Sequence, residues 1–129
     1  MLNSAKLVAF VPTKDFDTAR QFYEGVLGLR FLSQDAFALV MEANGTTVRI
    51  AKVDKFTPAQ FTILGWQVKE IKSAVAALRA KGLTFERFPG MQQDELGIWN
   101  APGGDKVAWF KDPDGNILSL TQQTRPQQR

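Results

Sequence analysis

Residues 107–121, VAWFKDPDGNILSLT, are the stretch on which the fold depends. The segment DPDGN at 112–116 has tight-turn chemistry, because proline presets φ, glycine tolerates positive φ, and Asp and Asn side chains bind nearby backbone N–H groups. The flanking residues alternate as in the two strands of a hairpin. One predicted face is wholly apolar and should pack on a helix, namely Ala108, Phe110, Leu118 and Leu120. The other mixes aromatic, aliphatic and hydroxyl groups, as a small-molecule cavity would, namely Val107, Trp109, Ile117, Ser119 and Thr121.

The composition is that of an ordinary globular protein. The 129 residues are 44% hydrophobic and 22% charged, which suits one domain or two half-size modules that share a core. No apolar run approaches the roughly 20 residues that span a membrane, and the N-terminus lacks the regions of a signal peptide. The absence of cysteine excludes disulfides and thiol chemistry. We therefore expect a cytoplasmic protein with no membrane partner.

The chain also contains no histidine, which removes the commonest metal ligand and the commonest general base near neutral pH. Any metal site would need Asp, Glu or amide oxygens, which favour hard cations. The net charge of +3 includes two arginines in the polar tail 123–129, and without them 14 basic residues face 13 acidic ones. Since no dense basic stripe is present, we expect no nucleic-acid partner.

The remaining pattern predicts the order βαβββ twice. In the first half, a strand at 5–13 precedes a helix at 16–27 capped by Asp15, and three strands follow at 30–35, 36–43 and 46–53, with the hairpin signal Asn44-Gly45. The second half has a strand at 61–68, a helix at 70–81, a short strand at 84–88, a polar loop at 89–97, residues 98–100 and the closing hairpin. The predicted domain comprises module one at 4–55, a linker at 56–60, module two at 61–122 and the tail. We expect an α+β fold in which the two modules form a curved mixed sheet around a cavity, with helices on its convex face.

Two motifs carry a resemblance to a known family. DFDTARQFY at 15–23, followed by VLGL at 26–29, resembles the first-helix signature of the vicinal oxygen chelate superfamily, and DPDGNILSL at 112–120 resembles its closing hairpin. That superfamily includes glyoxalase I, the extradiol dioxygenases and the bleomycin- and fosfomycin-resistance proteins. With the duplicated βαβββ order, the resemblance covers residues 5–122. It implies the fold, and it leaves the function open because this fold hosts many chemistries.

The family pattern also implies where its metal enzymes carry their ligands. The corresponding positions lie on four strands and are Val8, Arg49, Ile63 and Ser119. Such enzymes have His, Glu or Gln there. Val and Ile cannot bind a metal, a lone Ser hydroxyl is a poor ligand, and a guanidinium repels a cation. We therefore expect no metal and no other cofactor, and we expect the cavity itself to remain.

Arg49 is the most informative of these residues. In the strand TTVRIA at 46–51, Val48 and Ile50 suit the helix-packed face, which leaves Arg49 toward the cavity. Its five donors in a planar fork could hold a carboxylate, phosphate or enolate-like oxygen. The alternative is an edge-strand arginine that reaches water or pairs with Glu42 or another internal acid.

Aromatic residues supply the rest of the predicted ligand site. Phe10, Trp99 and Trp109 are interpreted as a stacking wall for a flat organic ligand. Phe37 is interpreted as ordinary core, and Trp66 as core on the helix side. Gln67 shares the face of Ile63 and would bond either a ligand carbonyl or backbone at the sheet rim. The predicted ligand-binding set is Val8, Phe10, Arg49, Ile63, Gln67, Trp99, Trp109 and Ser119.

Two functions from different classes follow. The first is a metal-free small-molecule-binding protein of glyoxalase or bleomycin-resistance type, which sequesters an aromatic or acidic organic ligand. The alternative is a glyoxalase-like isomerase or lyase that uses Arg49 as oxyanion stabiliser, with Glu42, Glu95 or a substrate group as base; a metal-dependent enzyme ranks third. No catalytic residue is assigned. We also expect a homodimer, since sheets of the family often complete their burial against a second copy and two-fold pairs are the commonest assembly.

Overall fold

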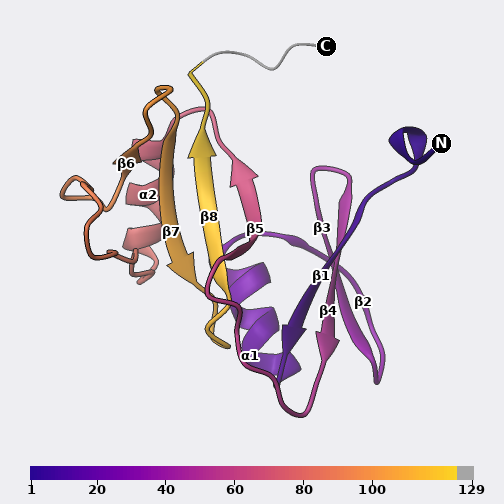
Figure 1. The fold of residues 1–129 in the computed structure, drawn as a ribbon. Coiled ribbons are helices and arrows are strands. Elements are labelled where there is room, and N and C mark those ends of the chain that lie inside the picture. The colour runs from indigo at the N-terminus through magenta and orange to yellow at the C-terminus, as the bar shows by residue number, and fades with distance from the viewer. Residues whose placement is uncertain (125–129) are drawn as a thin grey trace. The chain divides into compact units, whose positions relative to one another are not determined.

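The computed structural model describes residues 1–124 (Figure 1). The last five residues of the expected polar tail, 125–129, lie outside the described residues. The chain divides into two compact units, Met1–Pro58 (unit 1) and a second that begins at Ala59 (unit 2). Each unit contains one four-stranded mixed sheet with its own helix. The α+β class with two βαβββ modules is therefore confirmed.

Unit 1 comprises η1 (Leu2–Ser4), β1 (Val8–Thr13), α1 (Phe16–Arg20), η2 (Gln21–Val26), β2 (Arg30–Gln34), β3 (Ala38–Ala43) and β4 (Thr46–Lys52). The sheet order is β1-β4-β3-β2, with β1 parallel to β4 and the other pairs antiparallel. The turn between β3 and β4 has φ 47° at Asn44 and 86° at Gly45, the two positive values that a tight two-residue hairpin turn requires. The hairpin signal in the sequence is confirmed.

The predicted helix of unit 1 is one continuous segment that changes its pitch. Asp15 caps α1, because its Oδ2 accepts a hydrogen bond from the Thr18 N–H at 3.0 Å. The second half, η2, is π-helical, and the Leu27 N–H donates to the Phe22 carbonyl five residues back at 3.0 Å. The apolar side of this segment is buried at Phe16, Ala19, Phe22 and Tyr23, and the sheet residues Val11, Leu39, Met41, Val48 and Ile50 are buried with it. These residues form the helix-packed face of unit 1.

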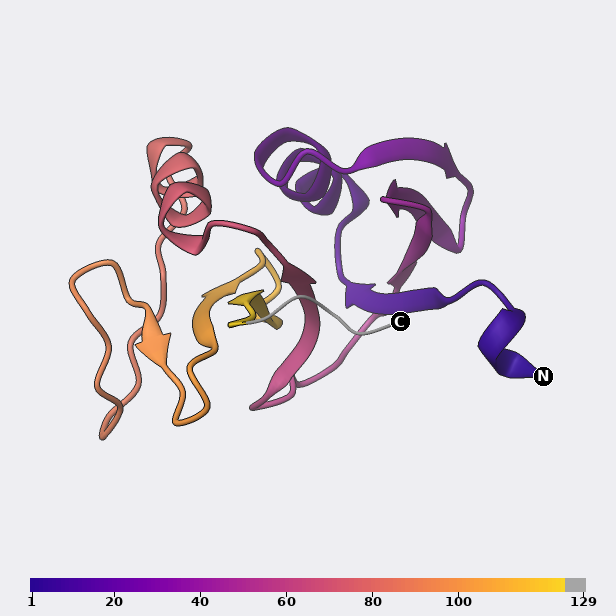
Figure 2. The same ribbon diagram turned by 90° about the horizontal axis from the view of Figure 1, so that it is seen from above.

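Unit 2 comprises β5 (Thr62–Gln67), α2 (Ile71–Ala80), β6 (Trp99–Asn100), β7 (Lys106–Lys111) and β8 (Ile117–Gln122), in the sheet order β5-β8-β7-β6. α2 lies against β7 and β8 (Figures 1 and 2). The predicted apolar face of the closing hairpin is buried there, at Ala108, Phe110, Leu118 and Leu120. The first N–H of α2, that of Ile71, donates to the side-chain oxygen of Gln122 on β8 at 2.8 Å.

The turn that joins β7 to β8 is organised by one carboxylate. Asp112 Oδ1 accepts hydrogen bonds from the backbone N–H groups of Asp114 and Asn116, at 3.0 and 2.9 Å. Asn116 Nδ2 donates to Asp112 Oδ2 at 2.8 Å, and both side chains are buried. Gly115 has φ 90°, which accounts for the glycine at this position. The DPDGN segment thus forms the turn that its composition predicts.

Residues 84–88 do not form the predicted strand. They contribute one isolated bridge, between Phe85 and Phe110. The segment is held instead by the Gln93 side chain, which accepts from the Phe88 N–H at 2.9 Å and donates to the carbonyls of Glu86 and Gly97 at 2.9 and 2.8 Å. Apart from the bond from the Glu86 N–H to the Trp109 carbonyl at 2.8 Å, this side chain replaces the hydrogen-bond ladder of a strand, so the second strand of module two is the two-residue β6.

Phe37 is not core, contrary to the sequence-based interpretation. Its side chain is 78% exposed. Asp35 Oδ1 accepts from the N–H groups of both Phe37 and Ala38, at 2.8 and 2.9 Å, and so closes the turn between β2 and β3 with Phe37 on its outside. None of the helices in residues 1–124 has the length and apolarity needed to cross a lipid bilayer.

Candidate functional site

Each sheet has a face opposite its helix, and strand alternation brings most of the predicted site residues to that face. In unit 1 it carries Val8 and Phe10 of β1 beside Arg49 of β4, because the register sets Phe10 directly across from Arg49. Val40 of β3 stands on the other side of Arg49. Phe10 is 64% exposed. We call this surface the open face of unit 1, formed by Val8, Phe10, Pro12, Ala38, Val40, Glu42, Thr47, Arg49 and Ala51.

The Arg49 side chain makes no hydrogen bond or ion pair within residues 1–124. The predicted alternative partner, Glu42, is engaged elsewhere: its Oε1 accepts from Arg30 Nε at 2.8 Å and its Oε2 from the Gly45 N–H at 2.9 Å. These contacts, chiefly the one with Arg30, hold the pKa of Glu42 below its usual value. The expected alternative of an Arg49–Glu42 pair is therefore wrong, and Arg49 is a half-buried guanidinium on a largely apolar surface.

Unit 2 presents an aromatic cluster on the corresponding face, formed by Phe88, Trp99 and Trp109. The ring centroids of Trp99 and Trp109 lie 6.0 Å apart, and Phe88 meets Trp109 edge-on at 5.5 Å. Trp109 Nε1 donates a hydrogen bond to Thr62 Oγ1 at 3.1 Å, which fixes the orientation of its indole. The sequence predicted the two tryptophans. It missed Phe88, because residues 84–88 were interpreted as a strand. It also missed Thr62, which lies far from Trp109 in the sequence and is brought to its indole by the fold.

Ser119 lies between Trp109 and Gly65, its partners across the sheet on β7 and β5. A Cβ added at Gly65 would lie 2.6 Å from Ser119 Oγ, so the glycine leaves the space that the hydroxyl occupies. Ser119 is 7% exposed, and its hydroxyl makes no hydrogen bond within residues 1–124. The signal that could have revealed Gly65 is a glycine inside a strand pattern.

Two further predicted residues lie on β5. The β5–β8 register shifts between Thr62 and Leu64, so Ile63 is the extra residue of a β-bulge. Gln67 pairs with Thr121, on the side of Gly65 and Ser119. Its exposed side chain makes no hydrogen bond in the described part of the chain, so the predicted bond to backbone at the sheet rim is not formed there. We call the surface formed by Thr62, Ile63, Gly65, Gln67, Val107, Trp109, Ile117, Ser119 and Thr121, together with the aromatic cluster, the open face of unit 2.

The residues at the positions where the resemblance implies metal ligands do not fit a metal ion. Unit 1 offers an aliphatic side chain at Val8 and a cation at Arg49, and unit 2 offers Ile63 and a single hydroxyl at Ser119. In residues 1–124, no three or more His, Cys, Asp or Glu side chains gather as a metal-binding group.

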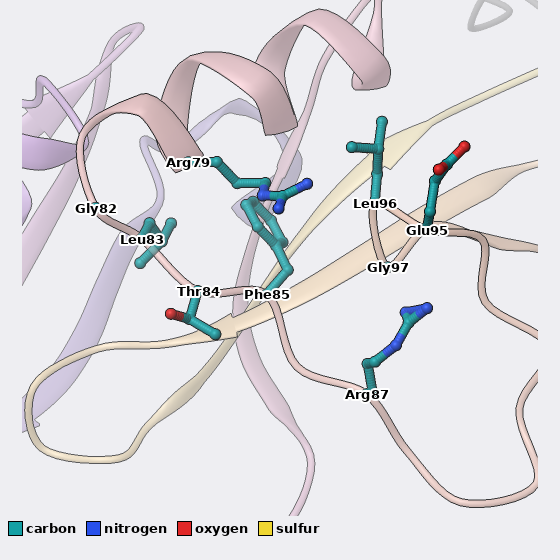
Figure 3. A pocket seen from close by; sticks show the side chains of 9 residues that line it. All are labelled: Arg79, Gly82, Leu83, Thr84, Phe85, Arg87, Glu95, Leu96 and Gly97. Atoms are coloured by element: carbon teal, nitrogen blue, oxygen red, sulfur yellow. The ribbon is translucent and has the colours of Figure 1, made fainter.

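A separate hollow of about 350 Å³ lies at the end of α2 (Figure 3). It is lined by Arg79, Gly82, Leu83, Thr84, Phe85, Arg87, Glu95, Leu96 and Gly97. Both terminal nitrogens of Arg87 donate to the Asp94 carbonyl, at 2.9 and 2.6 Å, and Arg79 lies in the last turn of α2, where a cation complements the helix carbonyls. The two arginines that line this hollow therefore have structural roles. The open faces of the two units remain the better candidates for ligand binding.

Comparisons with known proteins agree with this architecture. The family model for the glyoxalase/bleomycin resistance protein/dioxygenase superfamily matches residues 6–120. No curated protein matches the sequence. Among solved structures, TnmS3, an antibiotic binding protein from Streptomyces sp. CB03234, is 25% identical with a TM-score of 0.71, over 96% of this chain and 99% of that one.

Two more distant structures share the fold. Lactoylglutathione lyase from Agrobacterium tumefaciens is 16% identical with a TM-score of 0.71, over 92% of this chain and 93% of the other. A glyoxalase/bleomycin resistance protein/dioxygenase from Alicyclobacillus acidocaldarius is 15% identical with a TM-score of 0.69, over 95% and 93%. The duplicated βαβββ units and the match over nearly the whole described chain lead to one conclusion: the protein belongs to the glyoxalase/bleomycin resistance protein/dioxygenase superfamily.

Proposed function

We propose that the protein binds and sequesters a small aromatic organic molecule without a metal, on the open face of unit 2. The observation that carries this proposal is the aromatic cluster of unit 2. It brings two indoles and a phenyl ring together, and one of them, Trp109, lies across the sheet from Ser119. Aromatic walls with a few polar groups are typical of sites for flat organic ligands.

The cluster is organised before any ligand arrives. The bond to Thr62 holds the Trp109 indole, and the edge contact with Phe88 supports it from the side. Ordering a side chain on binding costs roughly 0.5–1.5 kcal/mol, and a ring that is already held avoids much of this cost. The arrangement therefore favours tight binding of a planar molecule.

Binding has more support than turnover. TnmS3, which shares the fold over nearly its whole length, is described as an antibiotic binding protein. The glyoxalase-like isomerase would need a base near Arg49, and Glu42 is ion-paired with Arg30 and has a lowered pKa, which makes it a weak proton acceptor. Glu95, the other candidate base, lines the hollow at the end of α2 and is not on either open face.

Tryptophan fluorescence can test the proposal with a panel of planar aromatic compounds and antibiotics. We expect saturable quenching and recovery of the ligand chemically unchanged. Trp109→Leu should weaken binding roughly three- to tenfold, since aromatic contacts contribute about 0.5–1.5 kcal/mol beyond area burial. Ligand affinity can be measured by calorimetry, so that loss of the fluorophore does not disturb the readout.

Trp66→Phe is the matched control. Trp66 stacks on Phe110 at 6.3 Å in the helix-packed core, so this variant removes an indole without changing the open face. It should bind like the unaltered protein. Equal affinity loss in both variants, or conversion of the ligand to a product, would contradict the proposed binding function.

A further inference from the structure

We infer that Arg49 anchors a carboxylate or equivalent anionic oxygen, so that the open face of unit 1 binds an organic acid. This inference goes beyond the proposed function, because it concerns a different surface. Arg49 lies on the open face of unit 1, directly across from Phe10. Its guanidinium is a cation that cannot deprotonate, and its planar fork of donors fits a carboxylate.

The first argument is the lack of an internal partner. Arg49 makes no hydrogen bond or ion pair within residues 1–124. Within residues 1–124, the only arginine or lysine bound to Glu42 is Arg30, and that carboxylate also accepts from the Gly45 N–H. The five donors of Arg49 are therefore not used inside its own unit.

The second argument concerns Asp35, an acid of unit 1 whose pKa is influenced by the charge of Arg49. The pKa of Asp35 is lowered mainly by its hydrogen bonds from the N–H groups of Phe37 and Ala38, and the Arg49 charge is the smallest of the contributing causes. Asp35 is thus committed to the turn between β2 and β3. Asp35 forms no ion pair with Arg49, so it does not neutralise the charge of the guanidinium.

The third argument is the apolar setting. The cross-strand neighbours of Arg49 on its own face are Phe10 and Val40, and Ala51 follows it along β4. A guanidinium that is partly withdrawn from water and has no anion nearby is unfavourable. Binding an acid would satisfy its donors, while the exposed Phe10 ring offers an apolar surface to the rest of the ligand. This combination selects for an acid with an apolar or aromatic body.

Matched pairs of probes test the inference: benzoate, 2-naphthoate and anthracene-2-carboxylate, each with its neutral primary amide. The unaltered protein should prefer the acid in each pair, and the preference should fall as salt is raised. Arg49→Met should weaken the acids roughly ten- to hundredfold, the range for a charge-assisted hydrogen bond, and leave the amides unchanged. Arg49→Lys should restore part of the loss, because the charge returns without the planar fork.

Lys52→Met is the matched control, because Lys52 lies three residues further along the same strand on the opposite face, where its Nζ sits 5.7 Å from the Phe16 ring centroid. It removes the same unit of charge and should leave the acid preference intact. Equal binding of acid and amide by the unaltered protein, or equal losses in Arg49→Met and Lys52→Met, would overturn the role of Arg49 while leaving the proposed function standing. Failure of both members of every pair to bind the unaltered protein would contradict the proposed function itself.

Discussion

Arg49 and Glu42 share one sheet face, yet only Glu42 has its charge neutralised within unit 1. The register sets Glu42 opposite Arg30 on one side and Thr47 on the other, and its two oxygens bind Arg30 and the Gly45 N–H. The pairing follows from strand order, since β3 lies between β2 and β4. Strand alternation in the sequence indicates that Arg49 and Glu42 face the same way, but it cannot indicate which cation the carboxylate binds.

Gly65 and Ser119 should be energetically coupled. Gly65→Ala should destabilise the protein because the new Cβ would approach Ser119 Oγ at 2.6 Å. In a Ser119→Ala background the same change should be neutral or stabilising, since the oxygen is gone and alanine restricts the unfolded chain more than glycine does. We expect a coupling energy of about 1–2 kcal/mol in a double-mutant cycle followed by urea denaturation. Additive effects would show that the hydroxyl simply rotates away from the new methyl group.

Site residues divide into those with a local signal and those without one. Trp109 and Ser119 are recognisable from the sequence because they occupy alternate positions of the closing hairpin, on its less apolar face. Gly65 and Thr62 acquire their roles only through pairing with β8 and with the Trp109 indole, partners about fifty residues away in the chain. No local pattern could reveal such long-range contacts.

At the scale of elements, the segment between α2 and β6 depends on one amide side chain. Gln93 is half-buried and makes three hydrogen bonds, to Phe88, Glu86 and Gly97. These bonds place Phe88 against Trp109. The loop thus contributes to the aromatic cluster although it forms almost no sheet.

Gln93→Ala should therefore loosen the loop and disturb the cluster. Three net hydrogen bonds of about 0.5–1.5 kcal/mol each suggest a loss of roughly 1–3 kcal/mol in the free energy of unfolding, once partial replacement by water is considered. Urea denaturation measures this loss, and a change in tryptophan emission in the folded state reports the altered packing of Phe88. Gln92→Ala, at the exposed neighbouring residue, should change neither quantity. An unchanged emission spectrum in Gln93→Ala would show that the hydrogen bonds of Gln93 do not hold Phe88 against Trp109.

The helices and hairpins were predictable because their signals are local. The spacing of apolar residues predicted both helices. Asn44-Gly45 predicted the turn between β3 and β4, and DPDGN predicted the turn between β7 and β8. Residues 84–88, TFERF, alternate like a strand, but Gln93 captures the backbone groups that a strand partner would bind. Phe37 has the hydrophobicity of a core residue, and the Asp35 turn leaves it outside.

At the scale of the whole molecule, we propose that the protein is a homodimer. Large apolar side chains are exposed in both units, including Leu7, Phe10, Phe37 and Phe61. Exposed apolar surface often marks an interface, and closed two-fold pairs are the commonest soluble assembly. Light scattering at micromolar concentration should give about twice the chain mass, and a mass near 14.4 kDa would refute the dimer. Leu7→Ser and Phe61→Ser, one in each unit, would then identify the surface that mediates association.

The parallel pairing of the first and last strands in each unit has a consequence for biosynthesis. β1 pairs with β4, and β5 pairs with β8. The first strand of each unit therefore cannot form its hydrogen bonds until the last strand of that unit has been synthesised. On the ribosome, unit 1 can assemble its complete sheet once residue 52 has emerged, while unit 2 needs residue 122. Because domains generally fold as units with the N-terminal one first, the nascent chain should acquire its structure in two successive steps. Until its partner strand has been synthesised, the first strand of each sheet remains unpaired with its apolar residues exposed. We expect a nascent-chain chaperone to bind this segment.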